Sequence, residues 1–170
     1  MNATTMQTYT GKLVDLANFR HEDVRIKDIA HALSLINRFT GHSVTPYSVA
    51  QHSVHVSKLI APEYALWGLM HDASEAYLGD VARPLKAMLP HYKELEEHVQ
   101  RTIAQVYGLC WPIPEEVKAA DNMALLAEKR DLLSVQHEWG IDVEPAEEPT
   151  VPHEWMVARG LFERRFLELY

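Results

Sequence analysis

Apolar residues recur every three or four positions through most of this chain, and this helical period limits the folds that it can adopt. Glycine, proline and short polar runs separate the periodic stretches, so each stretch predicts one helix. The predicted helices span, in order, residues 27–37, 46–60, 62–78, 91–107, 115–138 and 153–169. Six helices joined by short loops predict an all-α bundle that forms one domain over residues 1–170.

Three segments fall outside this pattern. Residues 7–15 hold a Thr-Gly turn between short apolar runs and predict a small N-terminal hairpin. Residues 80–90 are punctuated by prolines and predict a connector without regular structure. Residues 141–152 are acidic, contain three prolines and predict an exposed loop within the domain.

The composition excludes several classes of protein. The net charge of the 170 residues is −8, from 16 Lys plus Arg and 24 Asp plus Glu, and this balance argues against binding to a nucleic-acid polymer. The sequence has no apolar run near the ~20 residues that span a bilayer, and it starts without a secretory signal pattern. The single cysteine, Cys110, excludes an internal disulfide and is expected to be a buried thiol. We therefore expect a cytoplasmic protein that does not bind membranes.

Ten histidines are many for a chain of this length, and they direct attention to metal or acid–base chemistry. The strongest candidate is the pair His71-Asp72, which interrupts an apolar helical stretch and is followed one turn later by Glu75. Carboxylates on one helix face either share a proton or bind a cation. The alternative is a solvated polar face.

Two further candidates lie on apolar stripes. His52 belongs to the stripe of residues 46–60, and Asp121 belongs to that of residues 115–138. Each has an ordinary alternative, a core histidine and a surface or capping aspartate, but a buried aspartate must be paired or bound to a metal. Two imidazoles and two carboxylates suit a divalent Mn, Co, Fe or Zn ion better than Ca or Mg. The members of this set are His52, His71, Asp72 and Asp121.

Cationic residues lie near these candidates in the sequence. Arg83 and Lys86 follow Asp80 in the predicted connector. Arg38 immediately precedes Phe39. Beside a hydrolytic metal, arginine and lysine typically hold phosphate oxygens, and an aromatic ring stacks on a base or a sugar. Ordinary surface ion pairs and core packing are the alternatives.

The order of the metal-type residues resembles that of the HD-domain phosphohydrolases. Longer strings extend the resemblance over most of the chain, from Thr8 to Leu132. These strings are RFTGH, YSVAQHSV, LMHDASEAYLGDVARPLK and VKAADNMALLAEKRDL. They are similar to the YfdR/YfbR-like 5′-deoxynucleotidases and to the phage HD dATP phosphohydrolases.

The resemblance implies a role for each matched residue. The implied metal ligands are His52, His71, Asp72 and Asp121. Glu75 would orient or deprotonate the attacking water, and Asp80 would act as an acid–base group or hold the substrate. The expected substrate-binding residues are Arg38, Phe39, Arg83 and Lys86.

The sequence thus predicts a metal-dependent phosphohydrolase whose small-molecule substrate is a deoxyribonucleotide. The simplest reaction releases a deoxynucleoside and phosphate from a dNMP. One alternative is a dNTP phosphohydrolase with a bias to dATP, and another is a catalytically silent nucleotide-binding protein on the same fold. Substrate choice is open because Arg38-Phe39 stands where the 5′-deoxynucleotidases carry Arg-Trp, and because only 19 positions separate His52 from His71.

The last predicted helix bears on assembly. Residues 153–169 are expected to bury the side chains of Trp155, Leu161, Phe162 and Phe166. The apolar character of this helix, including Tyr170 at its end, favours a homo-oligomer. The tendency of the resembled family to form oligomers favours it as well.

Overall fold

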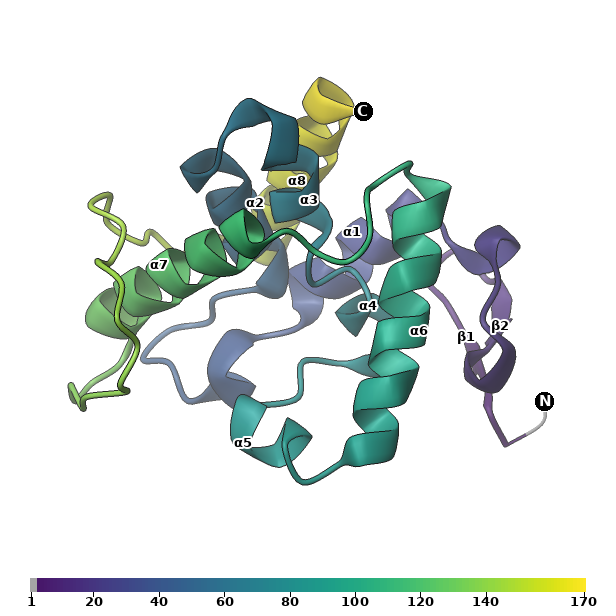
Figure 1. Ribbon diagram of the computed structural model, residues 1–170, viewed down its shortest axis with the longest axis horizontal. Helices are drawn as coiled ribbons and strands as arrows, with labels where there is room; N and C mark the ends of the chain where they lie inside the picture. The colour runs from purple at the N-terminus through teal and green to yellow at the C-terminus, as the bar shows by residue number, and fades with distance from the viewer. Residues whose placement is uncertain (1–2) are drawn as a thin grey trace.

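The computed structural model describes residues 3–170, and helices dominate it (Figure 1). The helices are α1 Ile26–Leu35, α2 Val49–Leu59, α3 Ala65–Met70, α4 Glu75–Leu78, α5 Arg83–Lys86, α6 Pro90–Val106, α7 Glu115–Leu132 and α8 Trp155–Leu169. The strands β1 Thr5–Gln7 and β2 Leu13–Asp15 form a small antiparallel sheet. The predicted all-α bundle with an N-terminal hairpin is therefore confirmed. Within the described residues, none of the helices combines the length and the hydrophobicity that a membrane span requires.

The α2 helix lies at the centre of the packing, because it contacts α1, α3, α7 and α8. The main core forms around it from fully buried side chains such as Ile29, Leu33 and Phe162. Each such side chain contributes about 1.5–3 kcal/mol when it is removed from water. Polar residues on α2 are consequently drawn into the interior, and His52 is fully buried.

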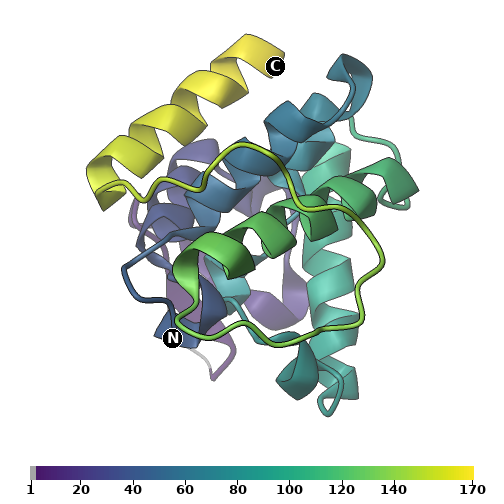
Figure 2. The same cartoon turned by 90° about the vertical axis from the view of Figure 1, so that its left-hand side faces the viewer.

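A long segment without regular structure crosses the outer face of α7 (Figure 2). We call residues 133–154 the strap. Part of it was expected to be an exposed loop, but Ala146 and Thr150 are buried. The backbone of Ala146 binds Met123 on α7, and the guanidinium of Arg130 donates to the Ala146 carbonyl at 3.0 Å. The strap is thus fastened to α7 rather than free in solvent.

The second helix begins later than predicted. It starts at Val49, because the preceding residues are extended and pair with the residues that follow α1. The hydroxyl of Ser48 accepts a hydrogen bond from the backbone of Gln51 at 3.3 Å and so caps the helix. Ser48 therefore supplies the N-terminal cap of α2.

The predicted third helix is divided by a turn at residues 71–74, between α3 and α4. In a continuous helix the backbone of Ser74 would donate to the carbonyl of Met70. The buried amide of Gln100, from α6, takes both positions: it accepts from Ser74 at 2.9 Å and donates to Met70 at 2.7 Å. His71 and Asp72 therefore lie on a turn, not on a helix face as predicted.

The predicted fifth helix ends six residues early, at Leu132. The side-chain amide of Gln136 folds back and donates to the carbonyls of Lys129, Arg130 and Leu133. These contacts satisfy backbone groups that would otherwise continue the helix. The strap starts there.

Smaller differences concern exposure. The predicted connector contains the short helix α5. The side chain of Trp155 is 38% exposed rather than buried, and Cys110 is exposed rather than buried. Phe162 and Phe166 pack into the core of this chain, so they give no support to the homo-oligomer, which stays a prediction.

Candidate metal centre and pocket

Two histidines face each other across the contact between α2 and α3. The helices approach closely at Gly68, where an added Cβ would lie 2.9 Å from the backbone of Ser57. This approach brings the Nε2 atom of His52, on α2, to 3.3 Å from the Nε2 atom of His71, just after α3. The absence of a side chain at Gly68 therefore permits the close approach of the helices that carry the two imidazoles.

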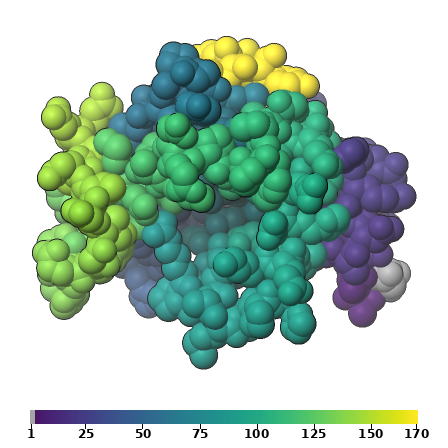
Figure 3. All heavy atoms as spheres, viewed as in Figure 1, coloured from purple at the N-terminus to yellow at the C-terminus, as the bar shows by residue number. Residues whose placement is uncertain are grey.

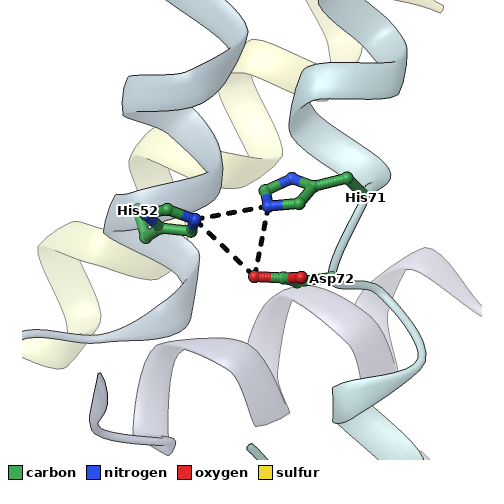
Figure 4. A group of neighbouring side chains, drawn as sticks. All are labelled: His52, His71 and Asp72. Atoms are coloured by element: carbon green, nitrogen blue, oxygen red, sulfur yellow. Dashed lines mark hydrogen bonds and ion pairs between the residues drawn. The ribbon is translucent and has the colours of Figure 1, made fainter. Parts of the chain in front are cut away.

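Asp72 completes a three-residue cluster (Figure 4). Its Oδ2 atom lies 3.2 Å from His71 Nε2 and 3.7 Å from His52 Nε2. The three side chains reach one point from α2 and from the turn after α3. This turn is the one in which Gln100 replaces the helical hydrogen bond between Ser74 and Met70. This His-His-Asp group could hold a metal ion.

The outer ring nitrogens of both histidines are engaged by acceptors. His52 Nδ1 lies 2.6 Å from Glu128 Oε1, and His71 Nδ1 lies 2.8 Å from the carbonyl of Gly68. A carboxylate and a carbonyl only accept, so each Nδ1 carries the proton and each Nε2 is directed toward the cluster. Metal-binding histidines are typically oriented in this way by a carboxylate or a backbone carbonyl.

The separations between donor atoms agree with a single bound ion. Two ligand atoms that are each about 2.1 Å from one ion lie about 3.0 Å apart at a right angle and about 3.4 Å apart at a tetrahedral angle. The observed separations are 3.2–3.7 Å within the cluster. Bringing three electron-rich atoms this close is unfavourable unless a proton or a cation lies among them.

The pKa of His52 also indicates that the cluster is stabilised by positive charge. Burial and the charge of Arg38 act to lower the pKa of His52, but the charge of Glu128 and hydrogen bonds to Asp121 and Glu128 raise it to about 9. Burial alone would raise the pKa of Asp72, yet His71, His52 and Arg38 hold it well below its usual range. Without an ion, a proton on His52 therefore neutralises part of the charge of the carboxylates.

Glu128 is a member of the site that the sequence analysis missed. Its side chain is fully buried, and its second oxygen accepts from Arg38 Nε at 2.8 Å. Burial acts to raise the pKa of Glu128, but Arg38 and His52 hold it below the ordinary value, so it is ionised. The available signal was its position seven residues after Asp121, which is the same helix face two turns on.

Asp121 lies beside the cluster on α7. Its Oδ1 atom is 3.1 Å from His52 Nε2 and 4.0 Å from His71 Nε2. Its Oδ2 atom accepts from Arg83 at 2.9 Å. Burial acts to raise the pKa of Asp121, but the hydrogen bond with His52 lowers it to about 2. Asp121 therefore presents an ionised oxygen to the two imidazoles.

A pocket of about 570 Å³ opens in front of the cluster. Figure 3 shows the recess between α7 and α5. It is lined by Arg38, Phe39, Thr40, Asp72, Glu75, Asp80, Val81, Ala82, Arg83, Pro84, Lys86, Asp121, Leu125, Trp139 and Ile141. The structure thus brings the predicted substrate-binding and acid–base residues to one cavity, together with the carboxylates of Asp72 and Asp121.

The two predicted acid–base residues have unusual environments. Glu75 is buried at the start of α4, and its Oε2 atom has no hydrogen-bond partner among the described residues. Burial first, and then the charges of Asp72 and Asp80, raise the pKa of Glu75 above its ordinary value. Burial also raises the pKa of Asp80, against the opposing charges of Arg38 and Lys86. Carboxyl groups of this kind in a pocket are suited to proton transfer.

The predicted phosphate-binding residues already have partners. Arg38 gives its Nε to Glu128, and its Nη1 lies 3.7 Å from Asp72 Oδ2. Lys86 uses one of its three donors on Glu96, at 2.5 Å. Arg83 is an exposed rim residue that binds Asp121.

The backbone is strained where the aromatic part of the pocket begins. Phe39 has φ 56° and Thr40 has φ 52°, a left-handed conformation that costs non-glycine residues energy. The ring of Phe39 lies 6.3 Å from that of Trp139, measured between ring centroids. Trp139, from the strap, was also missed by the sequence analysis, because a loop has no hydrophobic period to mark an inward-facing residue.

Comparison with known proteins places the chain in a family. No family model matches the chain. It is 45% identical over 127 residues to a protein of Escherichia coli named "uncharacterized protein YfdR", and the alignment covers 75% of this chain and 71% of that protein. It is 32% identical over 146 residues to an uncharacterized protein of Rhodobacter capsulatus, over 78% of this chain and 74% of that protein. The chain therefore belongs to the family of YfdR-like proteins.

Proposed function

We propose that this protein is a metal-dependent phosphohydrolase of deoxyribonucleotides, and most simply a 5′-deoxynucleotidase. The observation that carries the proposal is the convergence of His52, His71 and Asp72 on one point beside the pocket that Arg83 and Lys86 line. The converging atoms are of the type that hold a divalent cation. The cationic side chains are of the type that bind phosphate oxygens.

The proposed metal ligands are the three residues of the cluster together with Asp121. The donor types favour Mn, Co, Fe or Zn. When bound, such an ion lowers the pKa of water and offsets negative charge on phosphoryl oxygens. Arg83 fixes the carboxylate of Asp121 through Oδ2, which leaves Oδ1 directed at the histidines.

The remaining groups are arranged for proton transfer. In the proposed reaction the oxygen of water bonds to phosphorus, and the bond to the 5′ oxygen breaks with its electron pair on that oxygen. Glu75 takes a proton from the water through its carboxylate, whose buried Oε2 has no hydrogen-bond partner among the described residues. Asp80, whose pKa is also raised, gives a proton to the departing oxygen. Arg38 and Lys86 bind the phosphate oxygens.

Phosphate release from dNMPs, dNDPs, dNTPs and ribonucleotides, with Mn or Co and with an EDTA control, tests the proposal. We expect metal-dependent release from dNMPs. Glu75→Gln should lower the rate by about 10²–10⁴-fold, the usual contribution of a general base, without loss of bound metal. Glu163→Gln, in α8 outside the pocket, is the matched control.

The other outcomes separate the alternatives. Release confined to dNTPs would identify a triphosphohydrolase. Binding of metal and nucleotide without release from any substrate would indicate a silent nucleotide-binding protein. A stable protein that binds no metal and ignores chelators would overturn the proposal.

A further inference from the structure

The two ends of the pocket differ in chemistry. The end beside the His-His-Asp cluster carries the charged side chains. The other end is apolar and includes two aromatic rings, and it is formed by Phe39, Leu125, Trp139 and Ile141. A ligand that fills the whole pocket must therefore carry an anionic group at one end and an apolar, flat group at the other.

Trp139 reaches this apolar end because the strap carries it there. Gln136 fastens the beginning of the strap to the last carbonyls of α7. The ammonium of Lys129 lies 5.4 Å from the centre of the Trp139 ring and supports it from α7. The indole is nevertheless 40% exposed. A large aromatic surface is thus supported from α7 and left partly uncovered beside the pocket.

A second hollow of about 300 Å³ lies on the other side of Trp139. Trp139 and Ile141 line both cavities, and α7 residues such as Leu126 form the far wall of the hollow. This part of the strap therefore borders two cavities. A flat ring stacked between two parallel rings requires about 7 Å between them. The ring centroids of Phe39 and Trp139 are 6.3 Å apart and their planes are tilted by 51°, so the hollow gives Trp139 room for the small adjustment required.

We propose that Trp139 is the base-binding residue of this pocket: the nucleobase stacks on the indole of Trp139, opposite Phe39, while the phosphate lies at the charged end. The inference rests on the proposed function, and it assigns to the strap the recognition of the base. Stacking on an indole tolerates any base, so it selects nucleotides over phosphate esters that lack a flat ring.

Two substrates that differ only in the base test this inference. We expect Trp139→Ala to raise KM for a dNMP by about 5- to 100-fold, the loss that removal of one stacked aromatic partner gives. KM for 2-deoxyribose 5-phosphate, which has the same sugar and phosphate without a base, should change far less. Trp139→Phe should restore most of the affinity for the dNMP. Trp155→Ala, which alters another partly exposed tryptophan in α8, is the matched control.

A binding measurement separates this inference from the proposed function. In EDTA, where no turnover occurs, titration with dAMP should quench the tryptophan fluorescence of the wild-type protein, and Trp139→Phe should remove that quench. If the wild-type protein hydrolyses dNMPs but Trp139→Ala affects both substrates equally, the inference is wrong and the function stands. If no substrate is hydrolysed, the proposed function fails, and the quench alone decides: its presence supports the role of Trp139, and its absence overturns that role.

Discussion

The two sides of the pocket are built in opposite ways. The side formed by the His-His-Asp cluster is largely buried, and the outer nitrogens of its histidines are held by Glu128 and by a backbone carbonyl. The strap side is a loop that is fastened at a few points and leaves Trp139 partly exposed beside a second hollow. Chemistry requires donor atoms held within a fraction of an ångström, whereas recognition of a ring tolerates adjustment. Rigidity in this fold is therefore concentrated at the His-His-Asp cluster.

Removal of one imidazole should affect the rigid side most. We expect His71→Ala to abolish metal binding and, with it, metal-dependent phosphate release. Mn should raise the melting temperature of the wild-type protein, because an ion that binds only the folded state stabilises it, but should leave that of the variant unchanged. Metal content after dialysis provides the second measurement.

His91→Ala is the control, because His91 is almost fully exposed and lies outside the cluster. If His71→Ala retained one tightly bound ion for each chain, the His-His-Asp cluster would not be the metal site.

Loss of the charge behind His52 should have the next largest effect. We expect Glu128→Gln to weaken metal binding by about 10- to 100-fold, as is usual when the carboxylate that orients a metal-binding histidine is changed. It should also lower the free energy of unfolding by about 3–5 kcal/mol, since it removes the nearer of the two carboxylates that neutralise the buried guanidinium of Arg38. Metal titration and chemical denaturation measure the two effects separately.

Glu163→Gln removes an i,i+4 ion pair with Arg159 on the surface of α8 and serves as the control. Its effect on stability should not exceed about 0.5 kcal/mol. Equal metal affinities in Glu128→Gln and wild type would show that Glu128 does not orient His52.

The contrast between the two sides also decides what the sequence could predict. The helical period marked the elements that carry His52 and Asp121, because burial of one helix face is a local property of the sequence. The breaks made by Gln100 and Gln136 were missed, because side-chain amides replace backbone partners there and no local period records them. In the case of Gln100 the amide comes from a helix 26 residues away.

The residues of the candidate site also divide into those that the local sequence reveals and those that depend on tertiary packing. The sequence placed His71 and Asp72 on a helix face, yet the structure brings them to the predicted point from a turn. Glu128 could have been found, since it repeats the face of Asp121 two turns later. Trp139 could not, because its position depends on how the strap crosses α7.

The close approach of α2 and α3 at Gly68 gives a smaller effect. We expect Gly68→Ala to lower the free energy of unfolding by about 1–3 kcal/mol, because its Cβ would lie 2.9 Å from the Ser57 backbone and must push α3 away from α2. Metal affinity should fall as well, since His71 moves with α3. Gly160→Ala, in α8, meets no atom within 4 Å and should instead stabilise the protein by about 0.4–1 kcal/mol. Thermal and chemical unfolding measure both changes. A change of stability in the same direction in both variants would contradict this explanation.

The fastening of the strap should give the smallest effect, and one that depends on pH. Asp131 accepts hydrogen bonds from Arg130 and from the backbone of Thr150, and these lower its pKa from 3.8 to about 2. A carboxyl whose pKa is lower in the folded state stabilises that state above its unfolded pKa and loses this contribution as the pH falls. The excess in free energy of unfolding of the wild type over Asp131→Asn should therefore be constant above about pH 5 and shrink between about pH 4 and pH 2. It should stay within about 1 kcal/mol because the pair is largely solvated.

Hydrogen exchange at neutral pH tests the fastening directly. The Thr150 amide should exchange faster in Asp131→Asn than in the wild type, while the Ser74 amide, held by Gln100 on the rigid side, should not. Equal acceleration at both amides would mean that the two sides of the pocket open together, and the contrast between them would then fail.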